Sequence, residues 1–249
     1  MELIIKELSK SYQGQCVLDS INLAFRGGDV VGLVGKNGAG KTTFLNCLID
    51  LVKPDAGDLI FNGERLTGDR LALKRTLGVL SDVLPPVPEF SGFDYLRFVG
   101  ILHGVEETTF QKRSQELTAF FFDDTGALTK KISTYSTGMI KKIGLCGALL
   151  TVPSILLLDE PFAGLDPLSV NQLISFLKNY QRADRLVIIA SHDLNYIQEV
   201  ATRLVVLDEA VIKFDGGLSE FTANGTKLIN DALFDILAPK TKTMAFDWL

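Results

Sequence analysis

The sequence predicts an α/β fold with a doubly wound, mainly parallel sheet, an N-terminal antiparallel β-subdomain and an inserted α-helical subdomain. Three observations support this prediction. The apolar run at 30–34 is followed by a glycine-rich loop and then by a helical pattern over 43–51. A later apolar run at 155–158 and a mostly apolar segment at 185–190 alternate with helical patterns, and such segments indicate strands buried on both faces of a parallel sheet. Between these two regions, residues 91–150 have a helical period and almost no strand signal.

Length and composition indicate one large α/β domain. The chain has 249 residues, enough for such a domain with an inserted subdomain. Its net charge is −5, and the absence of a basic run argues against nucleic acid or an anionic membrane surface as the main partner. Three isolated cysteines fit neither a disulfide framework nor a metal spacing, which suggests a reducing compartment. Because we recognise no export signal and no membrane span, we expect a soluble protein.

The N-terminal part is predicted to form strands. Residues 2–8, residues 16–25 and the strand that enters the glycine loop are expected to be antiparallel, and 58–65 contains the Asn-Gly signal of a hairpin. Strands resume after the helical block and close the sheet at 203–207 and 211–214. We therefore divide the single domain into a core with its β-subdomain at 1–82 and 151–220, a helical subdomain at 83–150 and a short helical tail at 221–249.

The loop after residues 30–34 fits the phosphate-binding pattern G-x-x-x-x-G-K-[ST]. Its glycines let successive backbone N–H groups face phosphate oxygens, assisted by the positive end of the following helix. Lys41 would add a cation for the β- and γ-phosphates, and the Thr42 hydroxyl is placed to bind Mg²⁺. The alternative, a glycine turn with an incidental lysine, does not account for the strand and helix around it. The residues expected to hold the phosphates are Gly35, Asn37, Gly38, Ala39, Gly40, Lys41, Thr42 and Thr43.

Polar residues follow several of the apolar strands, at the edge where parallel strands gather catalytic groups. Asp159 and Glu160 are adjacent, so both can ionise at a buried edge only beside a cation such as Mg²⁺. Asp159 would then hold the metal, and Glu160 would act as general base toward the attacking water. Asp82 and His192 end two other strands. The structural alternative for Asp159 and Glu160 is that they are two acids at an exposed strand end. The structural alternative for His192 is a helix cap or a core histidine.

Three further residues have a structural and a functional interpretation. Tyr12 is expected in a turn, either as a half-buried tyrosine or as a stacking platform for adenine. Ser136 is expected to cap a helix start, and the N–H groups of such a helix tip also bind anions. Asp166 precedes Pro167, a pair typical of an N-cap followed by proline at the first helical position.

Taken in order, these motifs resemble the nucleotide-binding subunit of an ATP-binding-cassette (ABC) transporter, a P-loop NTPase, over nearly the whole chain. The resemblance rests on Tyr12, the phosphate loop, Tyr-Ser-Thr-Gly-Met at 135–139, Leu-Leu-Leu-Asp-Glu-Pro at 156–161, Ala-Gly-Leu-Asp at 163–166 and Ser-His-Asp at 191–193. It implies a head-to-tail dimer, in which ATP on the Lys41 loop of one chain is capped by Ser136 and Gly138 of the other.

The resemblance also implies roles for single residues. Tyr12 would be the adenine platform, Glu160 the catalytic carboxylate, and His192 the residue that contacts the γ-phosphate. Asp166 would cross the dimer interface, and Asp82 would take part in catalysis and in binding Mg²⁺ with Thr42 and Asp159.

At the level of the whole protein, the resemblance implies an Mg²⁺-dependent ATPase that drives a transporter. ATP would hold the dimer closed, and hydrolysis would open it. That motion would pass to separately encoded membrane permease subunits through residues 83–95. The partner ATPase is either a second copy or a paralogous subunit, and we expect the protein on the cytoplasmic face of the membrane.

The chain departs from the family pattern at a few positions. Asp82 stands where glutamine usually touches Mg²⁺ and the attacking water, and its extra negative charge predicts slower or more metal-dependent hydrolysis. Tyr135, Thr137 and Met139 replace the commoner leucine, glycine and glutamine, and Thr137 adds bulk where backbone must approach phosphate. Lys36 replaces a usual proline and is expected to be harmless. These variants are similar to those of the exporter branch with separately encoded permeases.

The leading hypothesis is therefore an ATPase subunit that powers an exporter. A second hypothesis keeps the ATPase but makes it a soluble conformational motor in cofactor assembly. A third is a nucleotide-gated scaffold without hydrolysis, which only Asp82 favours and which the set Asp159, Glu160 and His192 argues against.

Overall fold

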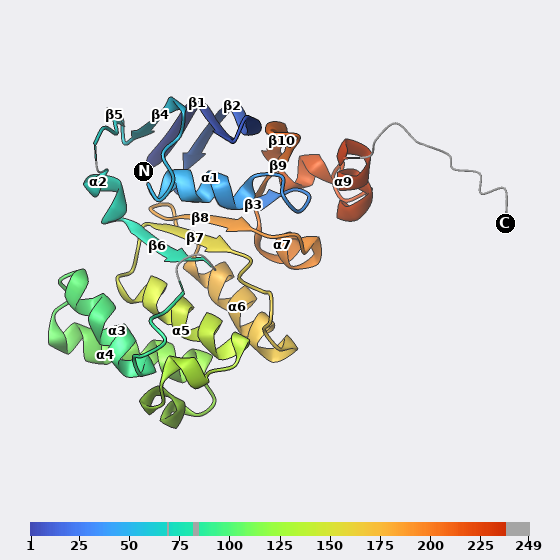
Figure 1. The fold of residues 1–249 in the computed structure, drawn as a ribbon. Coiled ribbons are helices and arrows are strands. Elements are labelled where there is room, and N and C mark those ends of the chain that lie inside the picture. The colour runs from blue at the N-terminus through green and yellow to red at the C-terminus, as the bar shows by residue number, and fades with distance from the viewer. Residues whose placement is uncertain (69, 82–84, 238–249) are drawn as a thin grey trace.

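Two β-sheets organise the fold in the computed structural model, which describes residues 1–68, 70–81 and 85–237. Within these residues, one sheet has the strand order β2-β1-β4-β5 and the other has the order β10-β9-β3-β8-β7-β6. Figure 1 shows the second sheet between α1 on one face and α5 and α6 on the other. The predicted mainly parallel α/β architecture, with its antiparallel N-terminal sheet, is confirmed.

The N-terminal sheet is antiparallel and is built from two hairpins. Strand β1 pairs with both β2 and β4, so that Leu3 lies opposite Phe25 on one side and Phe61 on the other. The Asn-Gly turn joins β4 to β5, and both Asn62 and Gly63 have positive φ, as such a hairpin turn requires. The strands are β1 (Glu2–Tyr12), β2 (Gln15–Arg26), β4 (Ala56–Phe61) and β5 (Glu64–Arg65).

Strand β3 (Val30–Val34) corrects one prediction, because it pairs in parallel with β8 and β9 and does not belong to the antiparallel sheet. All five of its residues are buried, as expected for a strand covered on both faces. Sequence order suggested antiparallel pairing, but burial on both faces requires the central position. The other strands of this sheet are β6 (Leu77–Leu80), β7 (Ile155–Asp159), β8 (Leu186–Ala190), β9 (Arg203–Asp208) and the antiparallel edge strand β10 (Val211–Gly217).

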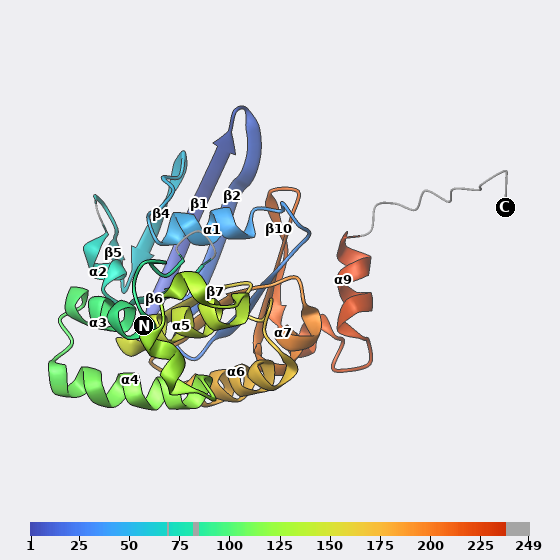
Figure 2. The same cartoon turned by 60° about the horizontal axis from the view of Figure 1, so that its bottom comes forward.

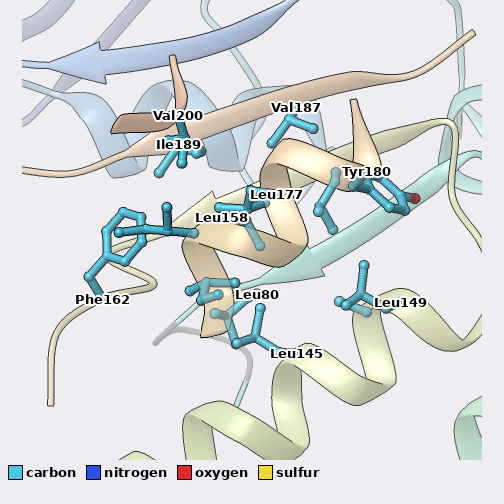
Figure 3. Packing of buried hydrophobic residues seen from close by; sticks show 14 of the residues in the cluster. Leu80, Leu145, Leu149, Leu158, Phe162, Leu177, Tyr180, Val187, Ile189 and Val200 are labelled. Atoms are coloured by element: carbon cyan, nitrogen blue, oxygen red, sulfur yellow. The ribbon is translucent and has the colours of Figure 1, made fainter. Parts of the chain in front are cut away.

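The central strands supply side chains to two hydrophobic cores, one on each face. In β7, Leu156 and Leu158 pack into the core formed with α5 and α6, whereas Ile155 and Leu157 pack into the core that includes Phe44 of α1. Figure 3 shows the first core, with Leu158 between the sheet and these helices. Because side chains on both faces of the strand are buried, its sequence is a continuous apolar run.

The predicted helical block is present. Its helices are α3 (Gly92–Leu102), α4 (Glu107–Phe121) and α5 (Thr137–Leu150), with short 3₁₀ turns at Thr125–Thr129 and Ile132–Thr134. Figure 2 shows α3 and α4 beside α5, and α5 packs against β6 of the sheet. The close approach of α5 to β6 depends on Gly78, where an added Cβ would clash with the backbone carbonyl oxygen of Ala148 in α5.

Helix α1 (Lys41–Leu48) begins two residues before its predicted start, because Gly40 acts as its N-cap, and it ends three residues before Leu51. Short α2 (Leu71–Lys74) precedes β6, and α6 (Pro167–Tyr180) and α7 (Leu194–Val200) follow β7 and β8. The C-terminal part contains α8 (Leu218–Phe221) and α9 (Ile229–Leu237), which lies beside α7. No helix among the described residues is long and apolar enough to cross a bilayer.

Candidate functional site

The phosphate-loop residues connect β3 to α1 in the predicted strand, loop and helix arrangement. Gly38 has a φ of 80° and Gly40 a φ of 104°, values that a residue with a side chain adopts only with strain. At Gly40 an added Cβ would also lie 2.7 Å from the carbonyl oxygen of Val17. The loop therefore needs glycine at this position for its conformation and for its close packing against β2.

Lys41 is held inside the loop that it follows. Its ammonium donates hydrogen bonds to the carbonyl oxygens of Gly35 at 2.8 Å and Lys36 at 3.2 Å. The residue is only 7% exposed, and this burial lowers the pKa of Lys41. The nearby Glu160 and Asp159 carboxylates act in the opposite direction and raise it, but the effect of burial is larger. A cation is thus held within the loop that the sequence predicts to bind phosphate.

Thr42 and Asp159 bring two oxygen ligands together from distant parts of the chain. The Thr42 hydroxyl donates to a carboxylate oxygen of Asp159 at 2.8 Å, and Asp159 is the last residue of β7. Among the described residues, no three or more acidic, histidine or cysteine side chains lie close enough together to hold a metal ion without other ligands. A hydroxyl beside one carboxylate still fits Mg²⁺, which keeps several waters and completes its shell with phosphate oxygens.

Glu160 is fixed in position by the end of β8. Its carboxylate accepts a hydrogen bond from the Ser191 hydroxyl at 3.1 Å, and its other oxygen accepts one from the His192 backbone N–H at 3.1 Å. The His192 Nδ1 lies 2.9 Å from the same oxygen. The His192 side chain is 62% exposed, and the N-cap of α7 is Asp193, so His192 is neither a core histidine nor that helix cap.

One cavity of about 430 Å³ collects most of the predicted nucleotide-binding residues. Tyr12 stands at its edge, where it is the last residue of β1 and not part of the turn, and it is 43% exposed. An exposed ring at a cavity edge is available for stacking. The cavity is lined by Tyr12, Val17, Asn37, Gly38, Gly40, Lys41, Thr42, Thr43, Asp159 and Glu160.

A second cavity, of about 550 Å³, contains the other predicted residues. Ser136 is the N-cap of α5, its hydroxyl accepting from the backbone N–H of Met139 at 3.3 Å, as predicted. Gly138 and Asp166 line the same cavity, together with Thr137, Met139, Lys142 and Gly164. None of its lining residues lines the Lys41 cavity, so the structure of one chain does not bring the two predicted sets together.

Asp166 also has its predicted structural role. It is the N-cap of α6, with Pro167 following, and it accepts a hydrogen bond from the backbone N–H of Ser169 at 3.0 Å. Hydrogen bonds from the Ser169 hydroxyl and backbone lower the pKa of Asp166 to about 2. Asp82, the remaining predicted residue, lies outside the described residues.

Two lysines that sequence reasoning did not assign to the site have side-chain contacts beside it, one from within the phosphate loop and one to Glu160. Lys36 donates to the carbonyl oxygen of Leu237 at 3.0 Å and lies 3.4 Å from a carboxylate oxygen of Asp208. Lys141 donates to the backbone carbonyl of Glu160. Neither contact leaves a signal in the sequence, because each joins residues far apart in the chain through a side-chain amine and a backbone carbonyl.

The strand β3, its phosphate loop and the hydroxyl–carboxylate pair on a mainly parallel sheet define a P-loop NTPase. Residues 18–163 match the family described as ABC transporter. The chain therefore belongs to the ABC transporter family, as an ATP-binding component.

Known proteins are similar over most of the chain. The "Doxorubicin resistance ATP-binding protein DrrA" of Mycobacterium tuberculosis is 29% identical over 222 residues, which is 88% of this chain and 67% of that protein. A solved "ATP binding subunit of ABC transporter" has a TM-score of 0.86 and 26% identity, covering 95% of this chain and 99% of its own. The ATP-binding cassette MJ0796, solved as a dimer "bound to ADP and Pi", has a TM-score of 0.79 and 23% identity, covering 87% of this chain and 98% of its own.

Proposed function

We propose that this chain binds and hydrolyses ATP to drive an ABC exporter, by ATP-dependent head-to-tail dimerisation coupled to membrane permease subunits. One observation carries the proposal. The Lys41 loop and the Ser136 helix tip line separate cavities of the same chain, and each cavity has only part of the groups that a triphosphate needs. Two chains in opposite orientation would bring each loop against the helix tip of the other.

In the proposed site, this chain holds the nucleotide with its own loop. Tyr12 stacks on the adenine, and the backbone N–H groups of the loop with Lys41 bind the phosphates. The Ser136 hydroxyl, the N–H groups near Gly138 and the dimer-crossing Asp166 act on the nucleotide of the partner. The α5 tip suits this role because a helix N-terminus attracts anions.

Thr42 and Asp159 would hold Mg²⁺, joined by Asp82. When bound, Mg²⁺ would neutralise charge that develops on the phosphate oxygens. Glu160 accepts the proton of the attacking water, and its hydrogen bonds from Ser191 and His192 keep the carboxylate oriented. His192 is exposed enough to reach the γ-phosphate while its Nδ1 stays beside Glu160.

A third cavity, of about 430 Å³, supports the coupling to permease subunits. It lies between α1, β6, α3 and α5, and its wall includes the apolar side chains of Leu51, Val79 and Val99. The predicted contact segment reaches it through Tyr95, and α3 also carries the exposed apolar side chains of Phe98, Ile101 and Leu102. A cavity with apolar and charged walls on a helix that exposes apolar side chains is suited to a protein partner.

The exporter assignment is supported by the relative named for doxorubicin resistance and by the motif variants at 135–139. The partner ATPase is a second copy or a paralogue, and the complex would sit on the cytoplasmic face of the membrane as a peripheral assembly. The apolar surface on α3 favours this function over a soluble motor in cofactor assembly.

The first prediction tests the proposed chemistry with Glu160→Gln. The amide keeps the shape of the side chain but cannot accept the proton, so phosphate release should fall at least about a hundredfold. ATP-dependent dimerisation, followed by light scattering after size exclusion, should persist. Glu64→Gln on the exposed β5 serves as the matched control. Retained turnover would remove Glu160 from its role, and a variant that stays monomeric with ATP would contradict the dimer mechanism.

A further inference from the structure

Lys141 is a buried cation that lies on α5 little more than one turn beyond the tip carrying Ser136 and Gly138. The residue is only 6% exposed, although it is a lysine on a helix that begins at the surface. Burying an ammonium is costly unless polar partners replace water. The Lys141 ammonium donates to the backbone carbonyl of Glu160, the residue proposed as general base.

Glu160 needs such support because its backbone is in the left-handed region, with a φ of 46°. This conformation is unfavourable for a residue with a side chain and persists only where surrounding contacts impose it. The Glu160 N–H donates to the carbonyl of Ala190 at 2.8 Å, and its carboxylate is held by Ser191 and His192. The carbonyl is the remaining polar group of Glu160; it accepts a long hydrogen bond from the Ala163 N–H at 3.3 Å, and Lys141 is the side chain that binds it.

We infer that Lys141 is a positioning residue that holds the backbone of Glu160 in the conformation that directs its carboxylate at the attacking water. This inference rests on the proposed function. Lys141 does not line the Lys41 cavity or the Ser136 cavity, so it acts through Glu160 and not through the nucleotide. The same helix then serves both sites of the dimer, with its tip at the partner's ATP and Lys141 at its own Glu160.

The second prediction concerns Lys141→Met, which removes the donor while keeping an unbranched side chain. A shift of the general base by about 1 Å is enough for a large loss of rate, so kcat should fall at least about tenfold. KM for ATP should change less than about twofold, because binding groups are untouched. Lys141→Arg retains a cationic donor and should recover most of kcat. Lys178→Met, the same change at an exposed lysine of α6, should leave both constants unchanged.

A second measurement separates this role from a purely structural one. In the Glu160→Gln background, Lys141→Met should leave ATP-dependent dimerisation intact. If the methionine variant does not fold, Lys141→Gln, which is shorter and uncharged, reports the same loss of kcat. An unchanged kcat in a folded variant, a rise in KM with kcat retained, or a loss of dimerisation would each overturn the inference. Failure of the proposed function looks different, since the unsubstituted protein itself would then release no phosphate.

Discussion

At Asp166 one carboxylate combines a local and a proposed intermolecular role. It caps α6 through Ser169 and lines the cavity of the Ser136 helix tip, with the ammonium of Lys142 4.0 Å away. The cap alone explains why aspartate precedes proline here. The exposed carboxylate remains available to a partner chain, so the two interpretations of this residue are compatible.

The third prediction is a pH dependence of stability that comes from Asp166. Its pKa in the folded chain is about 2, below the ordinary value of 3.8, so the folded state favours the charged carboxylate. The stabilisation is therefore complete above about pH 5 and is lost as the pH falls toward 2. Urea unfolding of Asp166→Asn and the unsubstituted protein should give free energies of unfolding that differ by a constant amount above about pH 5 and converge as the pH falls toward 2. A difference that stays constant as the pH falls toward 2 would contradict the assignment.

Among the elements, α9 is linked directly to the phosphate loop. The Lys36 ammonium binds the carbonyl of Leu237 at the end of α9 and lies near Asp208 at the end of β9. A cation is favourable at a helix C-terminus, where carbonyl groups lack partners. Since Lys41 in turn donates to the Lys36 carbonyl, a short chain of contacts joins α9 to the ammonium proposed for phosphate binding.

The fourth prediction tests this link with Lys36→Met. Loss of one charge at a helix end costs about 0.3–1 kcal/mol, so α9 should remain folded but open more often. Hydrogen exchange of the amides in α9 should accelerate by a few fold, while ATP affinity changes little, in keeping with the expectation that Lys36 is harmless for binding. Lys213→Met, which removes an exposed pair with Glu209, is the control. Unchanged hydrogen exchange in α9 would show that the contact between Lys36 and Leu237 does not stabilise this helix.

For the whole molecule, the separation of the two cavities determines how the proposed ATPase must work. A single chain presents Lys41 in one cavity and Gly138 in the other, and no residue lines both. A symmetric dimer would contain two composite sites, each with contributions from both chains. In the proposed dimer, activity would depend on pairing, and an intact chain could compensate for a defect in one cavity of its partner.

The fifth prediction uses this complementation. Lys41→Ala removes the phosphate cation, and Gly138→Asp adds an anion at the capping tip, so each variant alone should be inactive. Random pairing of the two puts about half of the chains into mixed dimers, each with one intact site. Mixing should therefore restore phosphate release in proportion to the mixed dimers. A mixture as inactive as its components would contradict a shared site between copies of this chain.

Much of the fold could be predicted because its signals are local. The Asn62-Gly63 turn, the Ser136 cap and the Asp166-Pro167 helix start each depend on neighbouring residues, and the structure contains all of them. The phosphate loop is likewise contiguous in the chain. The orientation of β3 was predicted incorrectly, because strand direction depends on which distant strand pairs with it.

The sequence by itself determined the phosphate loop, the order of motifs and the residue types available for chemistry, since these depend on composition and spacing within short segments. Only the tertiary structure decided that Thr42 lies against Asp159, that Glu160 is held between His192 and Lys141, and that the capping set lines a different cavity. The physical reason is that these contacts join segments far apart in the chain. Their geometry is set when the parallel strands align and the helices pack on the two faces of the sheet.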